Sequence, residues 1–430
     1  MKDLNGKRLL LLGGSMWKEA ISTFAKDNGI VLIATGNDPS AGIFEIADEC
    51  YDIDSTDADG MKKLIIEKNI DGVYMGGSEP VISVACEYIN ELNLPCYCTK
   101  EQWDHLQNKK HFKKLCIEHG LPVVPQYEIN IDEITQELDC LDFPVITKPA
   151  DGCGSNGFSV CNNNKELQDG YIKALKTSST SEVLIEKFVK NKGVVVFYTA
   201  SNGQFYFSGI EDKYPVRFRE GDSYIGGAFI FESRKKNEFR SKFEEKIHQM
   251  FKSIGIKEGS LWIEVFVDGD KYFFNEMGYR YGGSVSIYPV DYFYHYNQVA
   301  ADIYYSLTNE SRIEGFPTLI STALERKKHY CVYPIQVREG TIRQIIGIDK
   351  ILQCNNVVAI PICMKVGYTV KHTGTFFQTF ALLHFVFDSK EEFRKIIRDS
   401  LSDLKVIDES GQNMVSSLFN AEEEEIEIVM

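Results

Sequence analysis

Two glutamates in neighbouring apolar segments are the residues of this chain best placed to do chemistry. Glu264 and Glu276 lie within Leu261 to Ser284, where two strand-like runs flank an Asp-Gly turn. If the loop is Asp268 to Asp270, Glu264 faces Phe274 and Glu276 lies diagonally on the same face, roughly 7–8 Å away. A two-residue loop would place the carboxylates on opposite faces. In the first register they can share a hard cation that also binds phosphates, whereas solvent-facing edge residues are the alternative.

A lysine followed by a glycine-rich loop lies upstream of this hairpin. Lys148 ends a strand-like stretch, and the loop after it contains Gly152, Gly154, Ser155 and Gly157. Such a loop can turn its N–H groups towards phosphate oxygens. It is not a Walker loop, because the lysine precedes the glycines and no Gly-Lys-Ser/Thr follows them. A flexible surface turn is the alternative interpretation.

Two further segments complete the set of candidate residues. Leu184 to Val189 is an apolar strand with an acid and a base, Glu186 and Lys187, near its end. Downstream of the glutamate pair, Arg280 supplies a fixed cation and is followed by Gly282-Gly283, whose backbone can approach a ligand closely.

The order of these motifs resembles the ATP-grasp superfamily of ligases, and the resemblance covers most of the chain. In that family a Rossmann-like domain precedes two lobes that hold ATP between two β-sheets. The fold class implied is therefore α/β and α+β. It comprises a Rossmann-like N-terminal domain at 1–100, a two-lobed ATP-grasp domain at 101–325 with a glycine lid at about 145–190, and a small β-rich C-terminal domain at 326–430. The last of these resembles the C-terminal domain of biotin-carboxylase-like members.

The resemblance implies nucleotide-binding roles for the upstream residues. Lys109, in the Gln-Asn-Lys step before a helix-like segment, is similar to the first phosphate lysine of the family, and Lys148 to the second. The loop from Gly152 to Gly157 resembles the lid over the β- and γ-phosphates. Glu186 would accept a hydrogen bond from the adenine amino group. The base pocket would be completed by Lys187, Phe188 and Val189.

The downstream residues are similar to those that act on the reacting groups. Glu264 and Glu276 resemble the two magnesium ligands, where Mn²⁺ would also serve, and Arg280 resembles the arginine at the reacting carboxyl-phosphate. We expect Lys213 to contact a phosphate or the acyl intermediate, with a solvated strand-end lysine as the alternative. One departure stands out: relatives commonly read Glu-x-Asn-x-Arg, whereas Gly278 replaces the asparagine here.

Composition and charge narrow the possible function classes. The chain has 430 residues of which 43% are hydrophobic, enough for about two to four domains. Its net charge of −15 argues against a nucleic-acid or anionic-membrane partner, since either favours a basic surface. No apolar run approaches membrane-span length and the N-terminus has no signal-peptide pattern, so we expect a soluble, cytoplasmic protein. The 11 cysteines are scattered, which favours reduced thiols over a zinc site.

Alternating strand and helix signals predict a parallel sheet in the first hundred residues. Arg8 to Leu12 and Ile30 to Ala34 are apolar runs separated by a helix-like stretch, and Val73 to Met75 and Pro95 to Tyr97 continue the pattern. A Gly-x-Gly-x-x-Gly fingerprint is absent after the first strand, so NAD binding is only a weak alternative. Beyond about residue 325 the pattern changes to short β segments and one helix, Lys390 to Asp403.

The function implied by the resemblance is an ATP- and Mg²⁺-dependent ligase. It would activate a carboxylate as an acyl phosphate for attack by an amine or thiol, so its partners would be small-molecule carboxylates and amines. Dimers are common in the family, so a homodimer is expected. Two alternatives remain open: an enzyme that forms carboxyphosphate, as biotin carboxylase and carbamoyl-phosphate synthase do, and a nucleotide-binding regulator without turnover.

Overall fold

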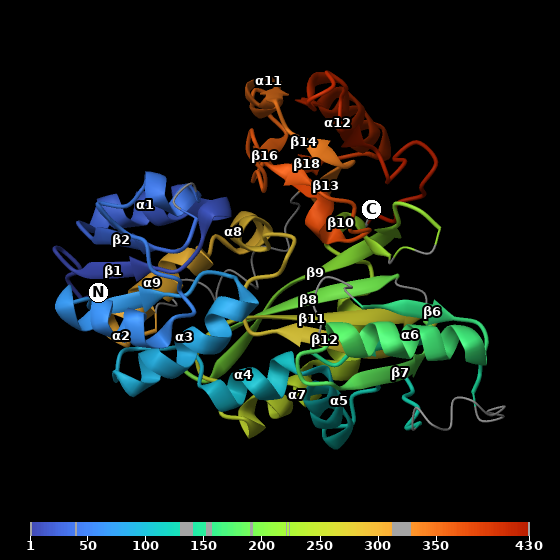
Figure 1. Ribbon diagram of the computed structural model, residues 1–430, viewed down its shortest axis with the longest axis horizontal. Helices are drawn as coiled ribbons and strands as arrows, with labels where there is room; N and C mark the ends of the chain where they lie inside the picture. Colours follow the sequence, from blue (N-terminus) through green and yellow to red (C-terminus); the bar gives the residue numbers. More distant parts are fainter. Residues whose placement is uncertain are drawn as a thin grey trace.

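The computed structural model describes residues 2–38, 41–129, 141–151, 157–189, 192–220, 222, 224–311 and 328–428. In these residues a four-stranded sheet, a three-stranded sheet and a nine-stranded sheet make up the main body of the fold (Figure 1). Two short two-stranded sheets lie in the C-terminal part, namely β14 (Gly340–Thr341) with β17 (Thr369–Val370) and β15 (Gln344–Ile346) with β19 (Lys405–Ile407). The mixed α/β and α+β class expected from the sequence is confirmed.

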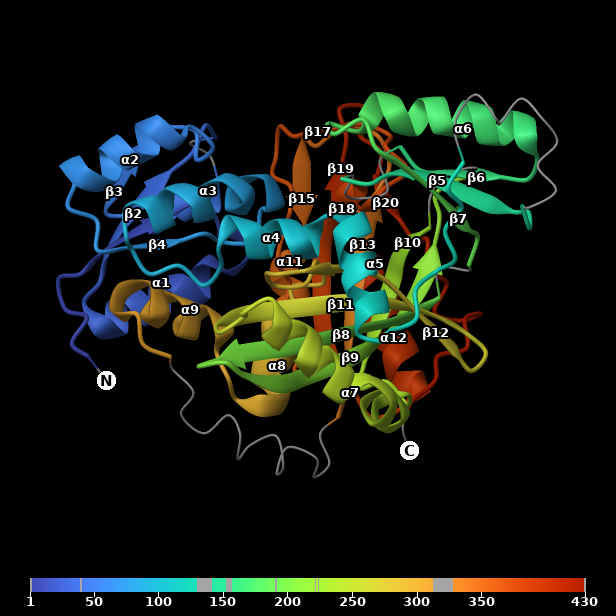
Figure 2. The ribbon, with the colours of Figure 1, turned by 90° about the horizontal axis from the view of Figure 1, so that it is seen from below.

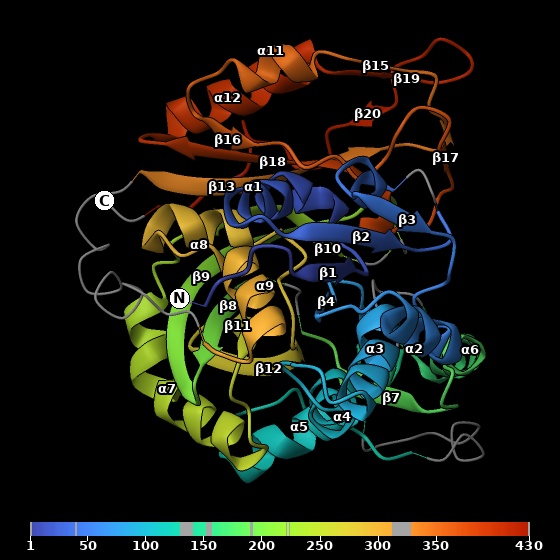
Figure 3. The ribbon, with the colours of Figure 1, turned by 90° about the vertical axis from the view of Figure 1, so that its left-hand side faces the viewer.

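The N-terminal sheet is parallel, with strand order β3-β2-β1-β4. Its strands are β1 (Arg8–Leu11), β2 (Val31–Thr35), β3 (Glu49–Tyr51) and β4 (Gly72–Tyr74), and its helices are α1 (Lys18–Asn28), α2 (Ala58–Glu67) and α3 (Glu79–Glu91). A helix from much later in the chain, α9 (Gln298–Thr308), packs against β4 and α1 (Figure 3). The sheet is therefore attached to the rest of the molecule through a buried helix.

The short strand expected at Pro95 to Tyr97 does not form. The Tyr97 ring packs edge-on against the Tyr279 ring, with 5.1 Å between their centroids. The Tyr279 hydroxyl donates to the Tyr97 carbonyl at 2.7 Å, and the Tyr97 hydroxyl donates to the Tyr279 carbonyl at 3.2 Å. These contacts hold the segment against the large sheet instead of at the edge of the N-terminal one.

The nine-stranded sheet runs in the order β12-β11-β8-β9-β10-β13-β18-β16, with β20 paired to β13. Its strands are β8 (Gly193–Ser201), β9 (Gln204–Val216), β10 (Ile225–Phe231), β11 (Gly259–Asp268), β12 (Lys271–Gly278), β13 (His329–Val337), β16 (Val357–Ala359), β18 (Thr379–Phe387) and β20 (Val415–Ser416). The C-terminal strands continue the same sheet because β13 pairs with β10. The C-terminal helices are α11 (Ile348–Leu352) and α12 (Lys390–Asp403), and α8 (Ile287–Tyr294) precedes α9.

Helix α7 (Lys236–Ser253) supplies much of the core beside this sheet. Its apolar side chains recur at helical spacing and all of them are buried in one cluster with the inner residues of β8, β11 and β12: Phe239, Phe243, Ile247, Met250 and Phe251. A helix with such an apolar stripe packs the stripe against the core.

The three-stranded antiparallel sheet, in the order β6-β5-β7, lies across from the large sheet and is covered by α6 (Figure 2). Its elements are β5 (Val145–Pro149), β6 (Ser159–Cys161), β7 (Val183–Lys187) and α6 (Asn164–Thr177). Asn163 caps α6 by accepting from the Glu166 N–H at 3.0 Å. Two helices, α4 (Lys100–Gln107) and α5 (Lys109–Glu118), connect this region with the N-terminal sheet.

The hairpin that carries the two glutamates differs from the expected one. Asp268 pairs with Lys271, so the loop has two residues, Gly269 and Asp270, instead of the three expected. A β-bulge at Asn275 shifts the register, because Val265 pairs with Phe274 but Glu264 pairs with Glu276. The bulge compensates for the shorter loop and returns both carboxylates to one face. The shared face was therefore predicted correctly, but from the wrong loop.

Candidate active site

A cavity of about 250 Å³ lies between the three-stranded and the nine-stranded sheet. Such a volume suits a small-molecule ligand. Most of the residues singled out from the sequence line it: Lys109, Lys148, Glu186, Lys187, Phe188, Val189, Lys213, Glu264 and Glu276. Their convergence from strands and helices far apart in the sequence makes the cavity the candidate active site.

Lys109 reaches the cavity from the first turn of α5. Asn108 caps this helix, and its side chain accepts from the N–H groups of Lys110 and His111 at 2.9 and 3.2 Å. A lysine in the first helical turn is electrostatically disfavoured. The Glu276 carboxylate, 3.0 Å from the Lys109 ammonium group, compensates this unfavourable interaction. Burial favours the neutral acid of Glu276, but Lys109 outweighs it and lowers the pKa of that carboxyl.

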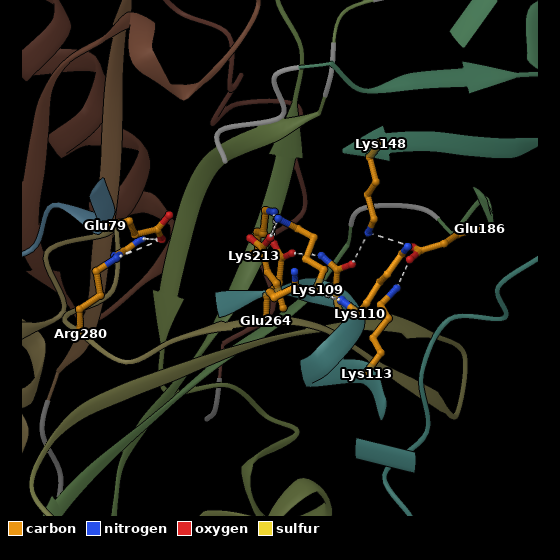
Figure 4. A network of polar contacts seen from close by, with 12 residues as sticks. Glu79, Lys109, Lys110, Lys113, Lys148, Glu186, Lys213, Glu264 and Arg280 are labelled. Atoms are coloured by element: carbon orange, nitrogen blue, oxygen red, sulfur yellow. Dashed lines mark hydrogen bonds and ion pairs between the residues drawn. The ribbon is translucent and has the colours of Figure 1, made fainter. Parts of the chain in front are cut away.

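Glu186 on β7 lies between two lysines. Its carboxylate is 2.9 Å from the Lys148 ammonium group and also accepts from Lys113 of α5 (Figure 4). Glu186 and Lys113 are 0% and 1% exposed, so one buried carboxylate is shared by two cations. Burial opposes its ionisation, but Lys148 and Lys113 together hold the pKa of Glu186 at about 2.

Lys113 is a functional candidate that sequence reasoning missed. Burial, and then the neighbouring charge of Lys148, lower the pKa of Lys113 to about 7 although Glu186 acts in the opposite direction. The available signal was its position on α5, one turn beyond Lys109 and on the buried side with Phe112 and Cys116. Glu186, which the family resemblance assigned to the adenine amino group, already accepts from Lys113, Lys148 and, at 3.2 Å, the Gln126 amide.

Asn275, the bulge residue of β12, is the second residue missed. Its amide nitrogen donates to Glu264 at 2.6 Å, and its carbonyl oxygen accepts from Lys148 at 3.0 Å. Asn275 therefore connects Lys148 of the small sheet to Glu264 of the large sheet. An asparagine oxygen is thus present beside the glutamate pair, although Gly278 stands where the family places its asparagine.

Lys213 on β9 forms an ion pair with Glu264 (Figure 4). It lies two residues beyond Glu211 on the same strand, and both line the cavity. The alternative of a solvated strand-end lysine does not hold, because Lys213 is 8% exposed.

The glutamate pair fits a magnesium ion that also binds phosphates. Within the described ranges, no three histidine, cysteine, aspartate or glutamate side chains converge as an all-protein metal site would require. Mg²⁺ is ordinarily held by one or two carboxylates together with substrate phosphates, which is the set that Glu264 and Glu276 offer. Asn275 adds an oxygen of the same hard character.

Arg280 lies outside this group. Its guanidinium forms an ion pair with Glu79 at the start of α3 and lies over the Trp262 ring, 5.3 Å from the centroid. It also donates to the Tyr281 carbonyl at 2.7 Å. Figure 4 shows Arg280 directed at Glu79 and away from Lys148 and Glu186. Arg280 is not among the residues that line the cavity, whereas Trp262, which it covers, does line it.

The remaining predicted residues divide between the cavity wall and the glycine loop. Lys187 pairs with Asp142, and the Phe188 N–H donates to the Pro144 carbonyl at 3.0 Å. Gly152, Gly154 and Ser155 lie outside the described residues. Gly157 has a φ of +77°, and a Cβ there would come within 2.0 Å of the Thr177 hydroxyl, so the position requires glycine.

Comparisons with known proteins agree with this arrangement. Residues 108–197 match the family described as the carbamoyl-phosphate synthase L chain, ATP binding domain. The L-amino acid ligase of Bacillus licheniformis superposes with a TM-score of 0.74 at 19% identity, over 95% of this chain and all of that one (100%). The biotin carboxylase domain of the Hydrogenobacter thermophilus 2-oxoglutarate carboxylase, solved with MgADP and bicarbonate, has a TM-score of 0.75 at 17% identity, over 95% and 91% of the two chains. Phosphoribosylglycinamide synthetase from Anaerococcus prevotii superposes with a TM-score of 0.70 at 15% identity, over 94% of this chain and 100% of that one.

Fold, cavity and sequence match together define a protein of the ATP-grasp fold, as the order of its motifs predicted. The matched segment begins at the cap of α5 and ends within β8. It therefore contains Lys109, Lys148 and Glu186, but neither Glu264 nor Glu276. Among the described residues, every helix is too short or too polar to cross a membrane.

Proposed function

We propose that the protein is an ADP-forming ligase, which activates a carboxylate with ATP and joins it to an amine. The observation that carries this proposal is the polar network of the cavity, in which Asn275 links Lys148 to Glu264 and each metal-binding carboxylate has its own lysine. The carboxylates suit a cation and the lysines suit phosphates. A nucleotide with its magnesium ion satisfies both sets at once.

The residues of the chain have distinct tasks in this proposal. Lys109, Lys148 and Lys213 bind phosphate oxygens and neutralise the charge that spreads over the transferred phosphoryl group. Glu264 and Glu276 would hold Mg²⁺, and their present partners Lys213 and Lys109 would then be available to phosphate oxygens. The bound ion would supply positive charge that stabilises the transferred phosphoryl group. Lys187, Phe188 and Val189 provide the wall for the base, and Glu186 holds Lys148 in place from behind.

The chemistry proceeds in two displacements. A substrate carboxylate oxygen attacks the γ-phosphorus, the bond to the β-phosphate oxygen breaks, and ADP leaves. The ammonium group of the second substrate gives up one proton to water, the free amine attacks the acyl carbon, the bond to the phosphate oxygen breaks, and phosphate leaves with the second proton of the amine. No covalent bond to the protein is needed. A site closed between two sheets protects the acyl phosphate from water.

A carboxyphosphate-forming enzyme is the second candidate. It is favoured by the likeness to the biotin carboxylase domain, which extends over 91% of that chain. Bicarbonate would take the place of the organic carboxylate, and the same lysines and glutamates would serve. An assay must therefore include bicarbonate.

ADP release measured against a panel of carboxylates, bicarbonate and amines tests the proposal. We expect continuous ADP release over many turnovers only when both a carboxylate and a nucleophile are present, because the carboxylate alone can form at most one acyl phosphate per site. Glu276→Gln should abolish this reaction and leave the fold intact, because the substitution replaces a charged oxygen ligand by a neutral one of equal size. Glu258→Gln, a buried glutamate outside the cavity, is the matched control. Substrate-dependent turnover at the parent rate in Glu276→Gln would refute the metal assignment.

A further inference from the structure

One buried carboxylate in the cavity has no part in the network described above. Glu211 on β9 is 1% exposed and lines the cavity together with Ser284. The Ser284 hydroxyl lies 3.2 and 3.4 Å from the two oxygens of Glu211. A hydroxyl has a single proton to donate. It can therefore satisfy only one of the carboxylate oxygens at a time.

The sheet places Glu211 at a fixed separation from the metal-binding pair. Val195 of β8 pairs with Glu264 on one side and with Glu211 on the other, so the three residues form one row on the cavity face. Two strand spacings separate Glu211 from Glu264, which is about 10 Å. Among the described residues no three acidic, histidine or cysteine side chains converge, so Glu211 is not a third member of the Glu264–Glu276 pair, and Lys213, two residues along β9 from Glu211, is ion-paired with Glu264.

The chemistry of the Glu211 position suits a ligand that brings a positive charge with it. An isolated buried carboxylate is costly, and burial raises the pKa of Glu211 well above its ordinary value despite Ser284 and Lys213. An ammonium group has three donors. It can donate to both Glu211 oxygens and to the Ser284 oxygen. The Ser284 oxygen can accept this bond while the Ser284 hydroxyl proton is donated to Glu211.

We propose that Glu211 and Ser284 form the subsite that binds the ammonium group of the amine substrate. That the ammonium group belongs to the amine substrate rests on the proposed function. Binding of an ammonium group by Glu211 and Ser284 does not depend on it. The nucleophile would then be held about two strand spacings from Glu264, and the acyl phosphate would lie beside Lys213.

The test measures binding and turnover separately. The probes are the amides of the common amino acids, which have an ammonium group and no carboxylate, and their N-acetyl derivatives, which have no charge. Calorimetric titration of the parent protein should detect a set of amides and none of the acetylated compounds. Glu211→Gln should weaken that binding by about tenfold to a hundredfold, the range expected for hydrogen bonds to a charged group. Glu258→Gln should leave it unchanged. Should Glu211→Gln not fold, Glu211→Met, which buries no polar group, replaces it.

The outcomes separate this inference from the proposed function. Hydroxylamine, uncharged at neutral pH, should trap acyl phosphate as hydroxamate equally well in the parent and in Glu211→Gln. Binding of amides that depends on Glu211, without any ADP release, would leave the subsite standing and refute the ligase. ADP release with unchanged amide affinity in Glu211→Gln would refute the subsite and leave the ligase. Binding of no amide by the parent protein would also overturn the subsite.

Discussion

At the scale of single residues, Lys113, the buried lysine of α5, changes the balance of charge around Lys148. Lys113 and Lys148 share the one carboxylate of Glu186, so the group carries a net positive charge when Lys113 is protonated, that is below its pKa of about 7. If Glu186 faced Lys148 alone, the pair would be neutral and phosphate would gain less from it. Lys113 thus acts on a bound nucleotide through its neighbours and is a positioning residue.

We predict that Lys113→Met weakens ATP binding by about tenfold, the effect of losing one charge-assisted contact. Methionine matches the length of lysine and needs no partner, so the fold should survive. Titration with ATP measures the change. Lys110→Met on the same helix is the matched control, because Lys110 is part-exposed and pairs with Glu182 at 3.1 Å, away from the cavity. Equal ATP affinities in the two variants would contradict this role for Lys113.

At the scale of elements, the bulge in β12 determines which side chains meet. A regular ladder continued from Asp268–Lys271 would place Asn275 opposite Glu264 and turn Glu276 to the other face. With the bulge, Asn275 and Glu276 both lie opposite Glu264. One extra residue in the strand therefore supplies the amide bridge and brings the second carboxylate, Glu276, to the face of Glu264.

Asn275→Ala tests the bridge between the two sheets. Without the amide, Lys148 loses one acceptor and Glu264 loses one donor, so we expect kcat to fall about tenfold or more while the melting temperature changes little. ADP release and thermal unfolding of the same preparation measure the two effects. Lys271→Ala, at the exposed end of the strand, should change neither. A loss of stability with an unchanged kcat would show that Asn275 only braces the hairpin.

The sequence allowed the elements to be predicted better than their pairing. Helix α12 has the bounds expected, Lys390–Asp403, because its apolar periodicity is long and regular. The bulge escaped prediction because register depends on neighbouring strands, not on local pattern. Lys113 escaped because a lysine on an amphipathic helix normally faces solvent. The packing of α9 on the N-terminal sheet is likewise a contact between distant segments.

At the scale of the whole molecule, a chain of buried polar groups joins the N-terminal sheet to α9. The Trp17 indole donates to the Tyr74 hydroxyl at 2.7 Å, Tyr74 contacts Tyr281 at 3.3 Å, and the Tyr281 hydroxyl donates to Asp302. Burial raises the pKa of Asp302 from 3.8 to about 7, although the bond from Tyr281 acts in the opposite direction. The folded protein therefore binds this proton more tightly than the unfolded chain does.

This proton gives a pH dependence of known sign. Because the folded pKa is the higher one, the stabilisation is complete below the unfolded value of 3.8 and is lost as the pH rises to about 7. Asp302→Asn should remove this contribution. The free energy of unfolding of this variant should therefore fall less than that of the parent between pH 3.8 and about 7. Urea unfolding at a series of pH values measures the difference. Asp59→Asn, an exposed control, should follow the parent. Parallel curves for Asp302→Asn and the parent would show that Asp302 is ionised in the folded state.

The ion pair between Arg280 and Glu79 joins the glutamate hairpin to α3 beside the N-terminal sheet. Substituting each of the two residues separately tests what this ion pair does. Arg280 lies over the ring of Trp262, a residue of the cavity wall, so this ring separates its guanidinium from the cavity. A planar fork can hold a carboxylate or acyl phosphate with two parallel hydrogen bonds, which lysine cannot copy.

We therefore predict that Arg280→Lys keeps ATP affinity but loses most of the substrate-dependent rate, with kcat falling by about a hundredfold and KM changing less. Glu79→Gln, which leaves the guanidinium in place, should lower kcat by less than about tenfold and reduce stability by about 1 kcal/mol or less, as expected for a part-exposed ion pair. Melting curves and ADP release recorded on both variants provide the comparison. If the pair only braces the two sheets, both substitutions will lower the melting temperature alike and the rate per folded molecule will stay at the parent value.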